Sequence, residues 1–297
     1  MAEISAELVK KLRMETNAPM MECKKALVEA NGNFSEALQI LKVRLGNKVS
    51  KVSSRTAAEG ILVSYTKGNI GVLLEINSET DFVAKQGEFV QFAKDVAQAA
   101  AASNVNDVEA LKHLPLNTGT NAGTIEAERT RLVGKIGENI VIRRFVRCES
   151  AHSVVVYIHS DNKKGALVEY KGNDAQLGKN IAMHIVAMNP VALSAKEVPA
   201  ELIAEKRRIF EISAKESGKP AEIIAKMTEG SMSKFLKEVS LLDQAFVCDD
   251  KQSIAQILKS NDAEIFSFTR YELGEGIEKQ VTDFASEVAE QIAAAAK

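Results

Sequence analysis

The chain contains no tryptophan, and only 5% of its residues are aromatic. Proteins that bind single-stranded nucleic acid use aromatic side chains as platforms on which bases stack. Proteins that bind duplexes carry a surplus of basic residues that neutralise the phosphates. Here 38 lysine and arginine residues are offset by 40 aspartate and glutamate residues, which leaves a net charge of −2. The composition therefore argues against direct binding to nucleic acid and favours a protein as partner.

Cysteine is scarce as well. The three that are present, Cys23, Cys148 and Cys248, stand far apart in the sequence. An odd number of cysteines with no C-x-x-C spacing argues against a disulfide framework and against a zinc site. The N-terminus lacks a basic segment followed by an apolar one, and no run reaches the ~18 apolar residues of a membrane span. We expect a cytoplasmic protein with no metal ion, no other cofactor and no membrane partner.

Sequence motifs of catalysis are missing too. No G-x-x-x-x-G-K-[ST] loop for nucleotide phosphates is present, and Gly274-Glu275-Gly276 lacks the strand-to-helix setting of a dinucleotide loop. No serine lies in a G-x-S-x-G turn, and the four histidines show no metal-ligand spacing. His184 lies in a helical run and is interpreted as a packing residue. We therefore do not expect an enzyme, although a cleft with converging ionisable side chains would revive that hypothesis.

What is present is an ordinary globular balance, with 45% hydrophobic and 26% charged residues over 297 positions. Residues 1–46 carry apolar side chains at helical spacing, interrupted at Asn17-Ala18-Pro19 and at Asn31-Gly32. They predict a three-helix N-terminal domain whose last helix ends at Gly46. Residues 47–58 are polar, basic and poor in large hydrophobic side chains, and they predict a linker.

Paired strand signals follow. Residues 60–65 and 70–76 flank a turn and predict a β-hairpin, which begins a first core subdomain over 59–138. A second hairpin resembles it, since Gly165 to Glu169 (GALVE) matches Gly71 to Glu75 (GVLLE). The match predicts two related subdomains, although chance similarity between two hydrophobic hairpins would also produce it. The second subdomain is expected over 139–273 and starts with a strand at 139–147.

Two helical segments complete the prediction. An antiparallel helical hairpin at about 193–229 is expected as an insertion in the second subdomain, because the strand pattern returns at 265–273. A C-terminal helical module is expected over 274–297, where apolar residues recur on one face of a helix. The predicted fold class is α+β, with a two-subdomain core of small antiparallel sheets covered by helices.

The segment Thr80-Asp81-Phe82-Val83-Ala84 is the most unusual feature of the chain. It places a carboxylate beside a large aromatic side chain in a polar loop that enters a helix. One interpretation is purely structural: Thr80 or Asp81 caps the helix and Phe82 packs inward. The other interpretation is that Phe82 stays exposed and contacts a partner.

Five motifs occur in order and span nearly the whole chain. They are Met20-Met21-Glu22-Cys23-Lys24-Lys25-Ala26-Leu27, Thr80-Asp81-Phe82-Val83-Ala84-Lys85, Ile136-Gly137-Glu138-Asn139-Ile140 with Arg143-Arg144, Ala182-Met183-His184, and Gly274-Glu275-Gly276-Ile277-Glu278-Lys279. Together they resemble the elongation factor Ts family of bacterial translation. The segment 114–123 departs from the family pattern and is interpreted as a variable loop.

The resemblance implies a guanine-nucleotide exchange factor that binds elongation factor Tu in its GDP-bound and nucleotide-free forms. It implies that Thr80, Asp81, Phe82 and Val83 enter the nucleotide domain of Tu, where Phe82 acts as a wedge and the magnesium ion that anchors GDP is displaced. Met20 and Met21 would contact the same domain, and the second subdomain would hold another domain of Tu. The resemblance also implies that the N-terminal domain is ubiquitin-associated-like (UBA-like). The helical hairpin is a candidate for dimerisation.

An alternative function belongs to another class of protein. The chain could be a non-catalytic interaction scaffold that uses its UBA-like domain to bind ubiquitin-like or peptide ligands. The exposure of Phe82 discriminates between the two hypotheses. An exposed Phe82 counts against the scaffold, and a fully buried Phe82 weakens the exchange hypothesis.

Overall fold

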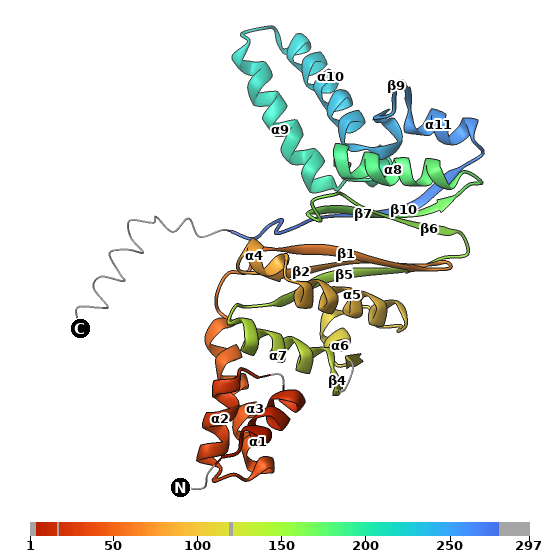
Figure 1. Cartoon of the computed structure of the whole chain (residues 1–297). Coiled ribbons are helices and arrows are strands. Elements are labelled where there is room, and N and C mark those ends of the chain that lie inside the picture. The colour runs from red at the N-terminus through yellow and green to blue at the C-terminus, as the bar shows by residue number, and fades with distance from the viewer. Residues whose placement is uncertain (1–3, 17, 119–120, 279–297) are drawn as a thin grey trace.

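The computed structural model describes residues 4–16, 18–118 and 121–278 (Figure 1). Three helices form the N-terminal unit: α1 (Ala6–Thr16), α2 (Met20–Glu29) and α3 (Phe34–Val52). Asn33 caps α3, because its side-chain oxygen accepts hydrogen bonds from the backbone N–H groups of Ser35 and Glu36. The helices share a small apolar core that includes Val9, Leu12, Cys23, Ala26, Leu27, Ala37 and Leu41. The three expected helices are therefore present, and the third is longer than predicted.

Helix α3 runs through Gly46 to Val52, so the predicted helix end at Gly46 is wrong and the first half of the predicted linker 47–58 is helical. One glycine in a helix costs only about 1 kcal/mol relative to alanine. Tertiary contacts outweigh that cost: Val52 is buried in the core of the first sheet, and Lys48 Nζ donates to the carbonyl of Gly134 at 2.9 Å. The helix thus docks the N-terminal unit on the rest of the chain.

The first sheet contains β1 (Glu59–Lys67), β2 (Ile70–Ser78) and β5 (Val141–Glu149), all antiparallel, in the order β1-β2-β5. Its outer face is covered by α5 (Gly87–Ala101), with α4 (Asp81–Ala84), α6 (Val108–Lys112) and α7 (Ile125–Ile136) beside it. A short hairpin of β3 (Pro115–Thr118) and β4 (Asn121–Thr124) precedes α7. Alternate residues of β2, namely Val72, Leu74 and Ile76, face the helices and are fully buried.

The second sheet has the order β10-β7-β6, built from β6 (Ser153–Ile158), β7 (Lys164–Lys171) and β10 (Glu264–Glu272). Helix α8 (Ala175–Met188) covers its outer face, and α11 (Ile254–Ser260) packs in the same core. Two 3-10 turns (Ala195–Glu197 and Leu241–Asp243) and the small β8–β9 ladder (Ala245–Phe246 and Asp249–Ser253) connect these elements. The mixture of helices and small antiparallel sheets confirms the α+β class.

Strand β5 lies in the first sheet, so the predicted start of the second subdomain at 139 is wrong. Its residue Ile142 is 2% exposed and packs in the first core, and Arg144 lies opposite Glu75 of β2. Each sheet therefore consists of a hairpin and a third strand that returns after the helices beside the second strand of the hairpin. The repeat seen in the sequence corresponds to this repeat of topology, with β5 matching β10.

The inserted helical hairpin consists of α9 (Ala200–Glu216) and α10 (Ala221–Val239), so both predicted limits, 193 and 229, lie too early. Pro199 immediately precedes α9, and residues 195–197 form a separate 3-10 turn. Helix α10 continues past residue 229 because Met232 and Phe235 extend its buried stripe. The predicted C-terminal module, 274–297, lies outside the described residues except for 274–278, which include the end of a turn. No helix in the described ranges is long and apolar enough to cross a membrane.

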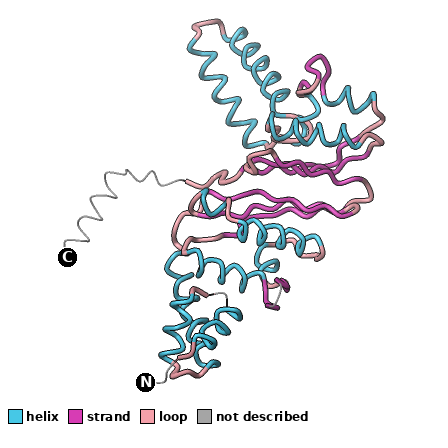
Figure 2. Tube along the Cα trace, viewed as in Figure 1, coloured by secondary structure: helices cyan, strands magenta, loops and turns pink. Residues whose placement is uncertain are grey.

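The two sheets pack directly against each other, with helices on the outer face of each, as Figures 1 and 2 show. A buried cluster joins them: Leu62, Leu73, Val154 and Leu167. The paired glycines of the repeat lie in this interface. A Cβ atom on Gly71 would stand 2.4 Å from Val154 Cγ1, and one on Gly165 would stand 3.1 Å from Leu73 Cδ1. At both positions of the repeat, glycine leaves the space that the facing sheet occupies.

We predict that Gly71→Ala lowers the free energy of unfolding by about 1–3 kcal/mol, because the added methyl group overpacks the interface at Val154. Val154→Ala makes room for that methyl group, so the double variant should lose less stability than the sum of the two single variants. Urea denaturation of the four proteins measures this. Gly46→Ala, where nothing lies within 4 Å of the new Cβ, is the control and should not destabilise. Strictly additive losses would contradict the proposed contact.

Candidate functional site

The Phe82 loop, residues 79–83, begins where β2 ends at Ser78 and enters the short helix α4. Thr80 caps α4, since its Oγ1 accepts from Val83 N–H at 3.4 Å. Thr80 is itself held by Glu138: its backbone N–H donates to Oε2 at 3.0 Å and its Oγ1 donates to Oε1 at 2.7 Å. Ser78 Oγ donates to the Thr80 carbonyl at 2.9 Å. The base of the loop is therefore fixed by several hydrogen bonds, two of them to a carboxylate.

The segment that supports this loop follows α7. Gly137 ends that helix in the left-handed conformation, with φ of 87°, which glycine adopts without strain. Asn139 N–H donates to Glu79 Oε1 at 2.6 Å. The side-chain amide of Asn139 donates to the carbonyls of Ser53 and Arg55. Two motifs that stand far apart in the sequence, at 80–85 and 136–140, thus form one structural unit.

Phe82 projects from this fixed base and is 77% exposed. Its neighbours Val83 and Ala84 are buried in the first core, at 3% and 5% exposed. The structural interpretation of the loop is therefore correct for the capping Thr80 and wrong for Phe82, which does not pack inward. Burial of a phenylalanine side chain is worth about 1.5–3 kcal/mol. Because this chain leaves that free energy unused, the loop is suited to bind an apolar surface of a partner.

Asp81 stands beside Phe82 at the start of α4. Its Oδ2 accepts from Lys85 Nζ at 2.7 Å, and the two side chains are 44% and 74% exposed. This hydrogen bond lowers the pKa of Asp81 below its ordinary value, so the carboxylate is ionised at neutral pH. An exposed pair of this kind stabilises the fold little. Its contribution is a negative charge next to an exposed aromatic ring.

Met20 and Met21 occupy the first turn of α2 and are 54% and 62% exposed. The structure does not bring them to the Phe82 loop, since α2 belongs to the N-terminal unit and α4 lies at the end of the first sheet (Figure 1). A partner that contacts both regions must reach along the side of the molecule from one to the other.

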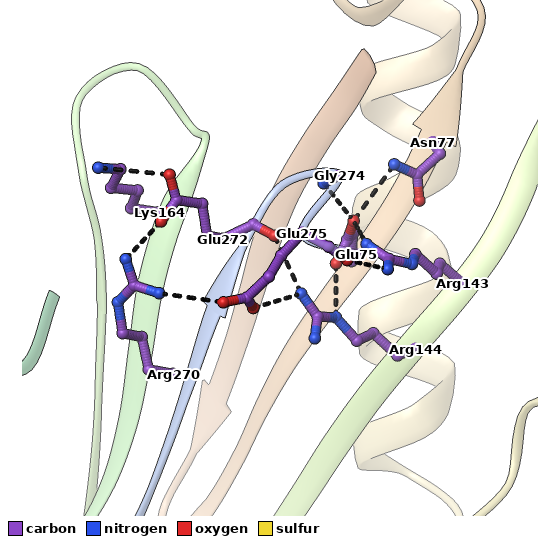
Figure 3. A network of polar contacts seen from close by, with 9 residues as sticks. All are labelled: Glu75, Asn77, Arg143, Arg144, Lys164, Arg270, Glu272, Gly274 and Glu275. Atoms are coloured by element: carbon purple, nitrogen blue, oxygen red, sulfur yellow. Dashed lines mark hydrogen bonds and ion pairs between the residues drawn. The ribbon is translucent and has the colours of Figure 1, made fainter. Parts of the chain in front are cut away.

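The sequence did not reveal a buried charged group in β2, the strand that leads into the Phe82 loop. Glu75 of β2 is fully buried and accepts from Arg143 NH1 at 2.8 Å, Arg144 Nε at 2.6 Å and Gly274 N–H at 2.9 Å (Figure 3). We call these four residues, with the rest of the turn 273–276, the Glu75 cluster. Burial opposes ionisation of Glu75, but the hydrogen bonds from Gly274 and the two arginines outweigh it and lower its pKa.

Further ion pairs connect this cluster to β7 and β10. Glu275 lies 3.4 Å from Arg144 and 3.8 Å from Arg270, and Glu272 pairs with Arg270 and Lys164 (Figure 3). The signal in the sequence was a single carboxylate within the apolar run of β2. Such a residue needs a cationic partner when it is buried. Which cations supply it depends on strand pairing between distant segments, which the sequence does not display.

The histidines and the surface cavities of the described residues provide no second candidate site for catalysis or metal binding. In the described ranges no group of three His, Cys, Asp or Glu side chains could hold a metal ion. His184 is fully buried, accepts from Val247 N–H at 3.2 Å and bonds Gln244 at 2.9 Å, and its burial lowers its pKa. It is a packing residue with satisfied nitrogen atoms, as predicted.

A hollow of about 680 Å³ lies between α3 and α7. Two of its three carboxylates, Glu126 and Glu128, are each held by an arginine three residues further along α7, at 2.5 and 2.7 Å. Both of these carboxylates are therefore engaged in ion pairs.

Comparison with known proteins places this geometry in a family. The family model described as "Elongation factor TS" matches residues 79–275. Proteins named elongation factor Ts from Burkholderia vietnamiensis and Paraburkholderia xenovorans are each 55% identical to the chain over 295 residues, and one from Burkholderia multivorans is 56% identical. In all three, the match covers 99% of both proteins. The residues matched by the family model contain the Phe82 loop and its Glu138 support, and the chain belongs to the elongation factor Ts family.

Proposed function

We propose that the chain is a guanine-nucleotide exchange factor for elongation factor Tu. It binds Tu with GDP bound, releases the magnesium ion and the GDP, and leaves Tu free to take up GTP during translation elongation. The observation that carries the proposal is Phe82, which is 77% exposed on a loop whose base is held by hydrogen bonds. The family name, which denotes a translation factor, supports the same proposal.

The mechanism that we propose is displacement by binding. Phe82 enters the nucleotide domain of Tu as a wedge, and the ionised Asp81 accompanies it, while Thr80 and buried Val83 keep the loop in shape. The chain contributes no general acid and no nucleophile in this mechanism. It is therefore a binding protein that alters a partner, not an enzyme that transforms a substrate.

The free energies involved are compatible with this mechanism. Nanomolar binding of a nucleotide corresponds to about 12 kcal/mol, and a thousandfold faster release requires about 4 kcal/mol of differential interaction. Burial of the Phe82 side chain provides about 1.5–3 kcal/mol of this. Loss of magnesium coordination to the phosphates provides the remainder, because that ion bridges and neutralises phosphate oxygens.

Further contacts belong to the same proposal. Exposed Met20 and Met21 would bind the nucleotide domain at a second place, and the second sheet with its helices would hold another domain of Tu. The protein would act in the cytoplasm, where translation occurs. The helical hairpin of α9 and α10 would be the place where two copies associate. The N-terminal three-helix unit would be of the UBA-like type.

The scaffold hypothesis is the less favoured alternative. It gives no reason for an exposed aromatic side chain on the first subdomain, whereas Phe82 is exposed there. Phe82 also stands on a loop with fixed hydrogen bonds, which a merely solvated loop does not need. The exchange hypothesis accounts for both observations.

We expect Phe82→Ala to slow the stimulated release of labelled GDP from elongation factor Tu at least tenfold, which corresponds to about 1.4 kcal/mol. The thermal midpoint should hardly change, because the side chain is mostly exposed. Val43→Ala, which shortens a 63% exposed apolar side chain on α3, is the control and should leave GDP release unaffected. A Phe82→Ala variant that unfolds several degrees earlier and still exchanges normally would show that Phe82 is a core residue.

A second variant tests the support of the loop. Glu138→Gln removes the negative charge that holds Thr80 N–H and Oγ1, and a hydrogen bond to a charged group is worth about 1.5–3 kcal/mol. We expect GDP release to slow by about tenfold and the amide of Thr80 to exchange faster with deuterated water. Glu88→Gln, which breaks a surface pair with Lys135, is the control. Faster amide exchange with unchanged GDP release would show that a fixed loop is not required.

A further inference from the structure

The Glu75 cluster joins the end of the described chain to the first sheet, although the strand that leads to it, β10, belongs to the second sheet. Arg144 NH2 donates to the Glu272 carbonyl at 2.9 Å, and Arg143 donates to the Glu275 carbonyl. Leu273 N–H donates to the Lys163 carbonyl at 2.7 Å. The turn 273–276 is therefore held from several sides, and Glu75 is the only fully buried charge among the residues that hold it.

A chain of contacts leads from this turn to the Phe82 loop. A Cβ atom on Gly274 would stand 2.6 Å from the carbonyl oxygen of Ala58, so the turn lies directly on the start of β1. The next residue, Glu59, is paired with Ser78, the last residue of β2. Ser78 in turn donates to the Thr80 carbonyl. In Figure 1 the described end of the chain and α4 appear at the same end of the two sheets.

Asn77 provides a second connection. Its side-chain amide donates to Glu75 Oε1 and to the Glu59 carbonyl, both at 3.2 Å. Asn77 is fully buried and directly precedes Ser78. A displacement of the Glu75 carboxylate would therefore be transmitted along β2 to the base of the loop.

Stability alone does not explain why such a charged group is present. A buried ion pair is often no more stabilising than well-packed apolar side chains of similar volume, and its best supported advantage is that it specifies one geometry. Here the carboxylate accepts from three donors in fixed directions, which apolar packing would not define.

We propose that Glu75 is a positioning residue for nucleotide exchange. Its carboxylate clamps the turn 273–276 against the start of β1, and the clamped turn fixes the orientation in which the Phe82 loop meets its partner. Glu75 contacts neither nucleotide nor magnesium and acts through Gly274 and the end of β2. The proposal rests on the exchange function proposed above, since it assigns a residue that sets the geometry of that reaction.

Two variants disturb the clamp in different ways. Glu75→Gln removes the charge but leaves Arg143 and Arg144 without their buried partner, which can destabilise the fold. Gly274→Ala leaves the ion pairs of Glu75 intact and forces the turn away from Ala58, because the new methyl group would overlap the carbonyl oxygen. If the fold of Glu75→Gln is lost, Gly274→Ala still tests the proposal.

Each variant has a matched control. Glu128→Gln changes another shielded glutamate that pairs with an arginine, since its 13% exposed carboxylate lies 2.7 Å from Arg131 on α7. Gly68→Ala imposes the same kind of backbone strain, since Gly68 has φ of +61° and Gly274 has φ of +73°, but nothing lies within 4 Å of its new Cβ. Both controls lie away from the turn and the Phe82 loop.

The experiment measures release of labelled GDP from elongation factor Tu at increasing concentrations of each full-length protein. We expect Glu75→Gln and Gly274→Ala to lower the maximal release rate by about tenfold, because small displacements of a positioned group have large effects on rate. The half-saturating concentration should change by no more than about twofold, since contacts away from the loop remain. Thermal unfolding of each variant confirms that the protein is folded.

The outcomes separate this proposal from the function on which it rests. If the wild-type protein does not accelerate GDP release, the exchange function itself is wrong. If the wild type is active and folded Gly274→Ala keeps the wild-type maximal rate, Glu75 does not position the loop through the turn. A raised half-saturating concentration with an unchanged maximal rate would also overturn the proposal, because the cluster would then support binding only.

Discussion

The two sheets pack face to face, and this contact determines where the functional residues can lie. Each sheet has helices on one face and the other sheet on its second face, so every residue of β2 from Gly71 to Ser78 is buried. A strand that is buried on both faces has no side chain available for a partner. The close approach at Gly71 and Gly165 makes the contact tight enough to exclude larger side chains. A residue of this segment that binds another molecule must therefore lie beyond the end of the strand, and the Phe82 loop directly follows the end of β2.

Burial on both faces also explains why the Glu75 carboxylate accepts hydrogen bonds from several donors. Glu75 and Asn77 lie on the inner face of β2, and each is fully shielded from water. The carboxylate is retained there because two arginines of β5 and a backbone N–H of the distant turn share it. The result is a frame in which the loop is held at both sides, by Glu138 and through the Glu75 cluster. A rigid loop loses little conformational freedom on binding, so more of the free energy of Phe82 burial is available to change the partner.

Much of this architecture could be predicted from the sequence, because the relevant patterns are local. Two strand-forming segments on either side of a glycine turn predicted the β1–β2 hairpin, and helical spacing predicted the three N-terminal helices. The ordered motifs identified the family. The limits of elements were less predictable: α3 passes Gly46 because Val52 and Lys48 contact elements that come much later in the sequence.

The features that could not be predicted depend on which segments meet. The strand pattern of β5 is the same whichever sheet it joins. Its place beside β2 is known only from the pairing of the two strands in the structure. The capping pattern at Thr80 fits both a buried and an exposed Phe82, and only the fold shows that Val83, not Phe82, faces the core. The hydrogen-bond donors of Glu75 come from residues 143–144 and 274. No pattern within either segment indicates that they meet at Glu75.

The central claim is that Phe82 acts where the magnesium ion and GDP are held in elongation factor Tu, and linkage between the ligands tests it most directly. If the chain weakens GDP binding by some factor, GDP must weaken binding of the chain by the same factor. The affinity of the chain for Tu should be measured by calorimetric titration without nucleotide, with GDP alone, and with GDP and magnesium. Binding should be tight without nucleotide and should weaken stepwise as GDP and then magnesium are added. Equal affinities under the three conditions would contradict the central claim, because a protein bound at a remote surface of Tu would not compete with either ligand.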